Sequence, residues 1–259
     1  MSLNAHHLNW PFAYPTYPGG KGGDCVYQAI INQMPLHDTF ISLFMGGGFV
    51  ENYKRLAKKN IFIDADTSVI NSWRSTIFGD GISLENIHLQ CSDYGTWLKT
   101  YFLLNPALNN PKTLIFSDPP YFEDVRSDKR KVYYKHELKS RAEHGRFLAY
   151  MSTPYIKAKV IICGYDSGYY NRILSPDRGW LTYTYMGRTR GGMREETLWM
   201  NFDPLDYPLH DYRYVGENAR QRHRIKKKVN REIEKLNRLP QREREALLNA
   251  IHHNYQITF

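Results

Sequence analysis

Short apolar runs alternate with helix-like stretches over residues 24–164, and this alternation restricts the fold more than any other feature of the sequence. The runs have five or six residues, and the stretches between them have ten or more residues with apolar positions three or four apart. Such runs are typical of strands buried on both faces, and their alternation with helices is typical of right-handed βαβ units. The sequence therefore predicts an α/β protein with a doubly wound parallel sheet.

The expected elements can be placed along the chain. We expect strands at Thr39–Phe44, Asn60–Asp64, Ile87–Cys91, Thr113–Ser117 and Lys159–Gly164, and helices at Asp24–Met34, Phe49–Lys58, Thr67–Ile77, Tyr94–Leu103 and Lys135–Thr153. After the fifth strand the pattern changes to two aromatic, β-rich runs, Trp180–Gly187 and Thr197–Phe202, with a glycine-containing tip between them. These two runs predict a terminal antiparallel hairpin.

Composition excludes several classes of protein. Of the 259 residues, 42% are hydrophobic and 24% are charged, which is typical of a globular chain and not of a disordered or fibrous one. No apolar run approaches the about 18 residues of a membrane span, and the N-terminus lacks the order of a secretory signal. The three cysteines form no C-x-x-C pair, so we expect neither a disulfide framework nor a zinc site, and a reducing cytoplasm suits the chain.

Positive charge is concentrated at the C-terminal end. The net charge is +9, and Tyr212–Phe259 holds 12 Lys and Arg against 5 Asp and Glu, a surplus of 7. Apolar residues three or four apart predict two helices there, Glu217–Arg238 and Pro240–Asn254. We therefore divide the chain into a catalytic domain, residues 1–205, and a basic helical appendage, residues 206–259. Such an appendage suits a polyanion, most plausibly nucleic acid, although a solvated helix pair would have the same composition.

The tetrapeptide Asp-Pro-Pro-Tyr at residues 118–121 is the most specific motif of the chain. It follows an apolar run, so we expect it at the carboxyl end of a central strand, where open α/β sheets bind ligands. Consecutive prolines remove two N–H donors and leave carbonyl oxygens that can accept hydrogen bonds. An aromatic amine can then donate to the Asp118 carboxylate and the Pro119 carbonyl, while Tyr121 offers a face for a flipped-out base. The alternative is an ordinary proline-rich turn.

A glycine turn, Gly46–Gly48, joins the first expected strand to the next helix. Glycines at this point let the backbone approach a ligand closely, but the pattern of a phosphate-binding P-loop is missing. The next strand ends in Asp64, about twenty residues further on, where a carboxylate can accept hydrogen bonds from ribose hydroxyls. Turn and acid together predict a cofactor that contains a nucleoside, whereas Asp64 as a helix N-cap is the alternative.

Five segments occur in an order that is found in a known family. They are Tyr17–Lys21, Phe40–Gly48, Asp64–Asp66, Asp93–Tyr94 and Asp118–Tyr121. Over roughly residues 15 to 202, this order resembles the Dam-like family of DNA adenine N6-methyltransferases. The resemblance implies a Rossmann-like, seven-stranded methyltransferase sheet that ends in an antiparallel hairpin. It also implies S-adenosylmethionine as the methyl donor, with S-adenosylhomocysteine as product and no metal.

The resemblance assigns roles to residues of this chain. The catalytic loop matches Asp118, Pro119 and Tyr121. The cofactor-binding positions match Tyr17, Lys21, Phe44, Gly46, Gly48, Asp64, Asp93, Tyr94 and Asp118. Tyr17 stands where the family usually has tryptophan, Tyr94 replaces phenylalanine, and Ser42 stands where the family usually has glutamate.

The stretch between the second strand and Asp93 is short. The family places a target-recognition region there, but Thr67–Ser92 has room for only one helix and one strand, so the family's GATC target is not carried over. Three basic regions can contact DNA instead: Arg126, Lys129, Arg130 and Lys131 in the segment Phe122–His144; Arg188, Arg190 and Arg194 at the hairpin tip; and the C-terminal helices. Because these side chains suit phosphates, which carry little sequence information, we expect relaxed specificity. Such breadth would suit a bacteriophage or prophage enzyme.

The sequence thus predicts an S-adenosylmethionine-dependent, adenine-specific DNA methyltransferase that acts by base flipping. Two alternatives stay open: methylation of unpaired RNA adenine, and an inactive nucleic-acid-binding protein of the same fold. The sequence also leaves open the target site, the presence of a partner restriction enzyme, and whether the C-terminal helices bind DNA, a partner or a second copy of the chain.

Overall fold

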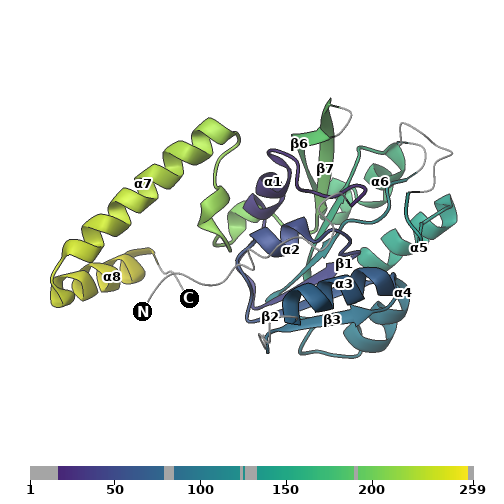
Figure 1. Cartoon of the computed structure of the whole chain (residues 1–259), viewed down its shortest axis with the longest axis horizontal. Coiled ribbons are helices and arrows are strands. Elements are labelled where there is room, and N and C mark those ends of the chain that lie inside the picture. Colours follow the sequence, from purple (N-terminus) through teal and green to yellow (C-terminus); the bar gives the residue numbers. More distant parts are fainter. Residues whose placement is uncertain (1–16, 79–84, 123–124, 126–132, 190–191, 256–259) are drawn as a thin grey trace.

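The computed structural model describes residues 17–78, 85–122, 125, 133–189 and 192–255, and its centre is a seven-stranded sheet (Figure 1). The strand order is β3-β2-β1-β4-β5-β7-β6. The strands are β1 Thr39–Leu43, β2 Lys59–Asp64, β3 Ile87–Cys91, β4 Thr113–Ser117, β5 Lys159–Gly164, β6 Leu181–Thr189 and β7 Gly192–Met200. The first five strands are parallel, and β7 pairs antiparallel with β5 and β6. The expected Rossmann-like methyltransferase fold, with its terminal hairpin, is confirmed.

Two apolar clusters cover the two faces of the sheet. On one face, Phe40 and Phe62 pack against α1 (Val26–Asn32), α2 (Phe49–Tyr53) and α3 (Thr67–Phe78). On the other face, Ile41 and Ile61 pack against α4 (Tyr94–Trp97), α5 (Arg141–Met151) and α6 (Gly168–Ile173). Neighbouring residues of a strand point to opposite faces of the sheet. Because helices cover both faces, β1 is buried along its whole length.

Several helices are shorter than the sequence predicted. The stretch expected as one helix from Lys135 begins only at Arg141, because Ser140 and Glu143 form a capping box: the Glu143 N–H donates to Ser140 Oγ, and Glu143 accepts from the Ser140 N–H. The helix expected to reach Lys58 ends at Tyr53. After α4 the chain continues as a π-helical turn, Leu98–Phe102, instead of an α-helix. The sequence did not predict α6.

The C-terminal segment stays on the body of the protein up to the beginning of α7 (Ala219–Arg238). The His210 ring stacks on His37 with 3.7 Å between centroids, and Asp211 accepts a hydrogen bond of 2.9 Å from the Arg55 N–H. Arg222, on the first turn of α7, lies 3.0 Å from Cys25 Sγ. Contacts with the body thus continue through Arg222, and the division at residue 206 stays a prediction.

Beyond Arg222, α7 extends away from the body and is followed by α8 (Gln241–Tyr255), as predicted (Figure 1). The apolar stripes of the two helices are incompletely covered: Leu247, Leu248 and Ile251 of α8 are 39–50% exposed. In the described part of the chain, no helix is both long and apolar enough to cross a membrane.

Candidate active site

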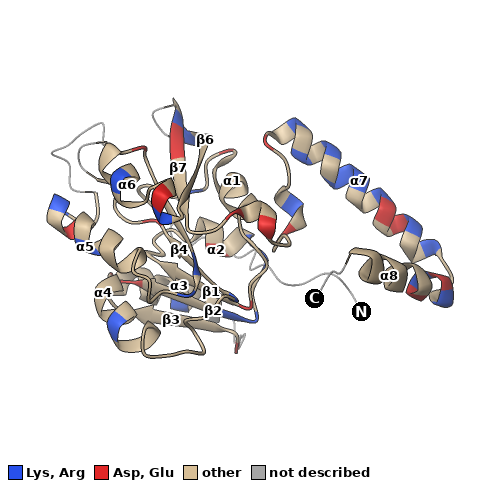
Figure 2. Ribbon diagram, turned by 180° about the vertical axis from the view of Figure 1, so that it is seen from behind, with Lys and Arg blue, Asp and Glu red and all other residues tan. Residues whose placement is uncertain are grey.

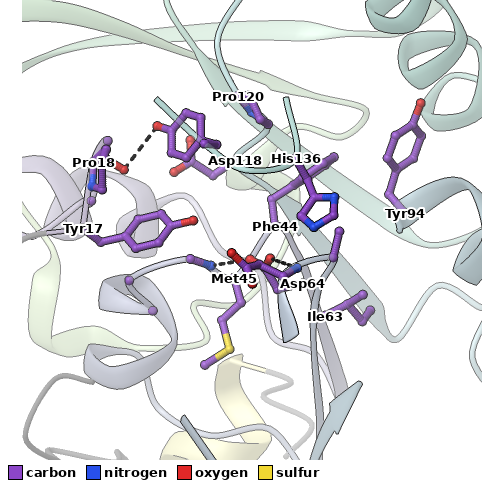
Figure 3. Close-up of a pocket in the computed structure, with 18 of the residues that line it drawn as sticks. Tyr17, Pro18, Phe44, Met45, Ile63, Asp64, Tyr94, Asp118, Pro120 and His136 are labelled. Atoms are coloured by element: carbon purple, nitrogen blue, oxygen red, sulfur yellow. Dashed lines mark hydrogen bonds between the residues drawn. The ribbon is translucent and has the colours of Figure 1, made fainter. Parts of the chain in front are cut away.

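A cavity of about 420 Å³ lies at the carboxyl ends of β1, β2 and β4 (Figure 3). Its lining comes from the ends of these strands and the segments after them, from Ser92–Tyr94 after β3, from Tyr17–Lys21, and from residues 134–139 and Glu143. Open α/β sheets bind ligands at this edge, and the volume lies in the range of small-molecule sites, about 300 to 1,000 Å³. The cavity is therefore the candidate ligand site.

All nine positions that the sequence assigned to the cofactor line this one cavity. They are Tyr17, Lys21, Phe44, Gly46, Gly48, Asp64, Asp93, Tyr94 and Asp118. Of the other two predicted catalytic residues, neither Pro119 nor Tyr121 belongs to the lining, whereas Pro120 does. Figure 3 shows Tyr94 on one side of the cavity, Tyr17 on the other and Asp64 between them.

The glycine turn after β1 depends on missing side chains. Gly46 and Gly48 have φ of +48° and +63°, a region that L side chains rarely adopt. A Cβ on Gly46 would lie 2.6 Å from the Tyr17 ring, and one on Gly48 would lie 2.5 Å from the Trp73 ring. Trp73 Nε1 also donates a hydrogen bond of 3.0 Å to the Gly46 carbonyl. Packing on both sides thus fixes a bare stretch of backbone along the wall of the cavity.

Asp64 ends β2 and bonds to two backbone amides. Its Oδ2 accepts from the Gly46 N–H at 2.9 Å, and its Oδ1 accepts from the Asp66 N–H at 2.8 Å. Burial raises the pKa of Asp64, while these two hydrogen bonds lower it. Capping of α3 falls to Asp66, which accepts from the Ser68 N–H at 2.9 Å. Asp64 therefore does not cap α3, and each of its oxygens keeps a lone pair for a ligand.

The end of the cavity around Tyr94, away from Tyr17, is aromatic. The Tyr94 ring packs against Phe44 and Phe147 with centroid distances of 5.4 and 5.3 Å. Asp93 caps α4, since its Oδ1 accepts from the Thr96 N–H at 2.9 Å. A flat ring with an amino edge would find an aromatic surface and carbonyl or carboxylate acceptors here.

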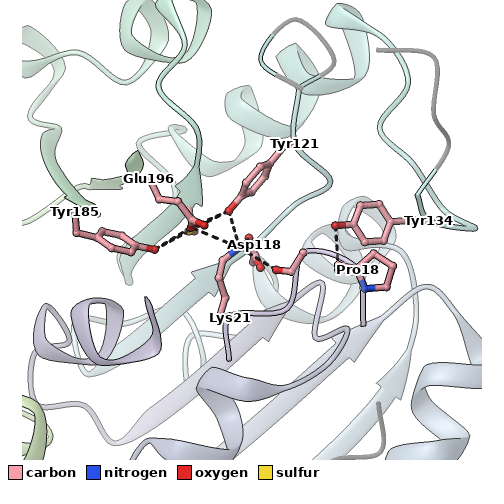
Figure 4. A network of polar contacts seen from close by, with 9 residues as sticks. Pro18, Lys21, Asp118, Tyr121, Tyr134, Tyr185 and Glu196 are labelled. Carbon is pink, nitrogen blue, oxygen red and sulfur yellow. Dashed lines mark hydrogen bonds and ion pairs between the residues drawn. The ribbon is translucent and has the colours of Figure 1, made fainter. Parts of the chain in front are cut away.

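A network of polar contacts surrounds Lys21 (Figure 4). Lys21 Nζ lies 2.9 Å from Asp118 Oδ1, 2.5 Å from the Tyr121 hydroxyl and 3.7 Å from Glu196 Oε2. Glu196 Oε2 accepts hydrogen bonds from Tyr121 at 3.1 Å and from Tyr185 at 2.9 Å. Lys21 therefore joins the loop before α1, the catalytic loop after β4 and the hairpin strand β7.

The charges of this network stabilise one another. Burial by itself would lower the pKa of Lys21, but the carboxylates of Asp118 and Glu196 hold it well above its usual value. Burial raises the pKa of Asp118 to about 6, against the opposing effect of Lys21. Near neutral pH, Lys21 is therefore a cation and Asp118 is an acceptor.

Sequence reasoning missed several residues of the site. Glu196, which is 4% exposed, had been placed in the hairpin tip, and Tyr185 and Cys163 contact it. Nothing in the local sequence marks Glu196, because its place beside Lys21 depends on the pairing of β7 with β5. Residues 135–139, expected at the beginning of a helix, line the cavity instead, together with Tyr134. Tyr134 donates to the Pro18 carbonyl, and Lys135 pairs with Asp66 at 3.3 Å.

Only two of the predicted DNA contacts at individual positions fall within the described residues. Arg188 is exposed on β6. Arg194 lies over the Tyr165 ring at 3.6 Å and donates to the Val125 carbonyl at 2.6 Å, so that it links β7 to the segment after the catalytic loop. The other five positions, Arg126, Lys129, Arg130, Lys131 and Arg190, lie outside the described residues.

Within the described ranges, no group of three or more His, Cys, Asp or Glu is arranged to hold a metal ion.

No protein-family model matches the sequence, and no curated protein sequence matches it either.

Solved structures with a similar fold share little sequence with this chain. A putative RNA methyltransferase from Pyrococcus horikoshii is 12% identical, with a TM-score of 0.38 over 67% of this chain and 78% of that one. A putative methylase from Haemophilus influenzae is 18% identical, with a TM-score of 0.43 over 70% of this chain and 90% of that one. A ribosomal protein L11 methylase from Lactobacillus delbrueckii is 15% identical, with a TM-score of 0.43 over 72% of this chain and 81% of that one.

Proposed function

We propose that the protein is an S-adenosylmethionine-dependent methyltransferase that transfers a methyl group to N6 of adenine in DNA. One observation carries the proposal: the residues of five separate sequence motifs line one cavity at the carboxyl edge of the sheet. Asp64 and Asp118, from β2 and β4, lie on either side of the glycine turn that follows β1.

The cavity fits the proposed cofactor in shape and in charge. The backbone of Gly46 and Gly48 forms a cradle that side chains would fill, and Asp64 offers acceptors for ribose hydroxyls. The lining contains seven carboxylates and three lysines. The carboxylates are Glu51, Asp64, Asp66, Asp93, Asp118, Glu137 and Glu143. Such a surface favours a cationic ligand, and S-adenosylmethionine carries a sulfonium.

The residues of the catalytic loop have separate roles in the proposed reaction. When bound, the cofactor supplies an electrophilic methyl group on sulfur. Asp118 accepts one N–H of the target amine, and the Pro119 carbonyl accepts the other, which orients the nitrogen lone pair toward the methyl group. The new N–C bond would form as the bond from sulfur to the methyl carbon breaks, with S-adenosylhomocysteine as the leaving group. The nitrogen would lose a proton, which the Asp118 carboxylate, with its pKa near 6, is placed to take.

Tyr121 is the residue on which we propose that the flipped adenine stacks. Its hydroxyl is held by Lys21 and Glu196, and Tyr165 packs on its ring at 72° with 4.5 Å between centroids. These contacts hold the ring in one orientation before a base binds, which lowers the entropy cost of stacking a base on it. Base stacking on an aromatic side chain stabilises binding by about 1–3 kcal/mol.

The long helix α7 supports a nucleic acid as substrate. One face of it is a basic stripe of exposed residues, most of them three or four apart: Arg220, Arg224, Lys227, Lys228, Arg231, Lys235 and Arg238. Figure 2 shows this charge along α7, away from the catalytic body. A helix of 20 residues is about 30 Å long, at about 1.5 Å per residue, so the stripe can follow several phosphates of a duplex.

A transfer assay tests the proposal. Purified protein with methyl-labelled S-adenosylmethionine is offered unmethylated duplex DNA, or RNA of the same sequence, and the labelled nucleoside is identified. We expect label on N6 of deoxyadenosine, with RNA labelled at least tenfold more slowly. Label in RNA alone would favour the rival RNA enzyme, and bound cofactor without transfer to either polymer would favour the inactive binding protein.

A further inference from the structure

A second buried carboxylate, Glu51, lines the cavity, and the reaction described above does not use it. Glu51 lies on α2, one turn after Gly48, and is 3% exposed. Ser42, which is fully buried in the middle of β1, donates a hydrogen bond of 2.5 Å to Glu51 Oε1. Strand and helix thus hold this carboxylate in one orientation beside the glycine turn.

Within the described residues, no salt bridge to Glu51 is found, and the nearest compensating charge is that of the buried Lys54, whose own pKa burial lowers to about 7. Burial raises the pKa of Glu51 to about 7, and the nearby charge of Asp118 raises it further, while the hydrogen bond from Ser42 and the charge of Lys54 lower it. A buried carboxylate close to another carboxylate is costly unless a positive group compensates it. In a cavity open to ligand, the ligand can supply that group.

The position of Glu51 indicates which part of a bound ligand it would contact. Tyr94 and Asp93 form the aromatic end of the cavity, and Asp64 lies in its middle (Figure 3). Glu51 lines the same cavity from α2, which directly follows the glycine turn, and it is close enough to Asp118 for the two charges to interact. A nucleoside with its base at Tyr94 and its ribose at Asp64 would direct the substituent on its 5′ carbon toward Glu51. In S-adenosylmethionine that substituent ends in an ammonium and a carboxylate.

We propose that Glu51, oriented by Ser42, binds the ammonium group at the methionine end of the cofactor. The inference rests on the proposed function, because it takes S-adenosylmethionine as the ligand. The inference also concerns Ser42, which stands where the family usually has glutamate. In this chain the carboxylate is that of Glu51 on α2, and Ser42 on β1 donates a hydrogen bond to it. An ammonium near Glu51 leaves Asp118 free to bind the target amine.

Two ligands that differ by one amine test this inference. S-Adenosylhomocysteine carries the ammonium, and its deaminated analogue, 5′-(3-carboxypropylthio)adenosine, lacks it. Calorimetry measures the affinity of both for the wild-type protein, for Glu51→Gln and for Glu195→Gln. The last variant removes a charge of the same sign from an exposed position on β7 and is the matched control.

We expect Glu51→Gln to weaken S-adenosylhomocysteine binding by about 10- to 100-fold, the usual range for a hydrogen bond between charged groups. The analogue should bind the wild type and Glu51→Gln with equal affinity, and Glu195→Gln should change neither value. Equal weakening of both ligands, or weakening of neither, would overturn the assignment. If the wild type binds neither ligand, the proposed function itself fails, which is a different result.

Thermal unfolding without ligand accompanies the binding measurements. If Glu51→Gln does not fold, Ser42→Ala is used, because it keeps the carboxylate and removes only the group that orients it. That variant should lose affinity for S-adenosylhomocysteine by a smaller factor and bind the analogue as the wild type does. An unchanged ratio of the two affinities in a folded Ser42→Ala protein would count against the proposal.

Discussion

Lys21 Nζ lies 2.9 Å from Oδ1 of Asp118, so one oxygen of the proposed catalytic carboxylate is already paired with a cation. Burial raises the pKa of Asp118, and the charge of Lys21 opposes this rise. The pair thus keeps a buried carboxylate ionised near neutral pH, which the proposed reaction requires.

This relationship predicts how methyl transfer depends on pH. The pKa of Asp118 is about 6, and protonated Asp118 donates a hydrogen bond where the amine needs an acceptor. The rate should therefore rise as the pH increases through about 6 and then become constant. Single-turnover rates between pH 5 and 8 check this, with folding at each pH verified by circular dichroism. A rate that is constant over this range would show that the ionisation of Asp118 does not control the reaction.

Asp64→Ala should weaken S-adenosylmethionine binding by about 10- to 100-fold, because ribose hydroxyls lose a charged acceptor and the Gly46 amide loses the group that fixes the glycine turn. Calorimetry on the free protein measures this without DNA. Asp203→Ala is the matched control, since it removes the same side chain from a cap outside the cavity lining and should bind the cofactor as the wild type does. If Asp64→Ala binds as tightly as the wild type, the expected cofactor position is wrong.

Glu196→Gln should destabilise the protein even though the residue lies outside the cavity. Its carboxylate accepts from two tyrosine hydroxyls and lies 3.7 Å from Lys21, and a neutral amide leaves that buried cation with only Asp118. We expect the free energy of unfolding to fall by about 1–3 kcal/mol in urea titrations. Glu195→Gln, one residue away and exposed, should stay within about 0.5 kcal/mol of the wild type. Equal stability of the two variants would rule out a structural role for the buried network.

Removal of residues 223–259 should weaken DNA binding and leave cofactor binding intact. The cut keeps Arg222, which packs on the body, and removes six of the seven residues of the basic stripe. For every phosphate that the shortened protein no longer neutralises, the slope of log K against log salt should become shallower by about 0.9 on duplex DNA. Fluorescence anisotropy over a series of salt concentrations measures the slope. If affinity and slope are unchanged but the molecular mass in solution falls, the two helices mediate self-association instead.

Much of the fold was predictable because strands are encoded locally. Three strands have the predicted bounds, and the others differ by one residue or by a few at the hairpin, since each is an apolar run bounded by turn residues. Helix ends were less predictable. The beginning of α5 depends on a capping box that competes with a longer helix, and the end of α2 depends on Lys54, whose side chain is buried beside Asn60.

The site was predictable to the extent that its residues follow strands of the parallel sheet. Asp64 and Asp118 could be expected at one edge, because the carboxyl ends of parallel strands meet there. Glu196 could not, because it reaches Lys21 only through the pairing of β7 with β5, between residues 175 positions apart. Glu51 was missed because its partner Ser42 lies on another element and nothing in the local sequence marks the pair.

The most direct test of the central claim is mass spectrometry of nucleosides from unmethylated duplex DNA treated with S-adenosylmethionine and either the wild-type protein or Asp118→Ala. The wild type should produce N6-methyldeoxyadenosine, and the variant should produce at least a thousandfold less while it still binds S-adenosylhomocysteine. Asp118→Ala protein that methylates adenine at a rate near that of the wild type would contradict the catalytic role of Asp118. A wild-type protein that binds the cofactor and forms no N6-methyldeoxyadenosine would contradict the claim itself.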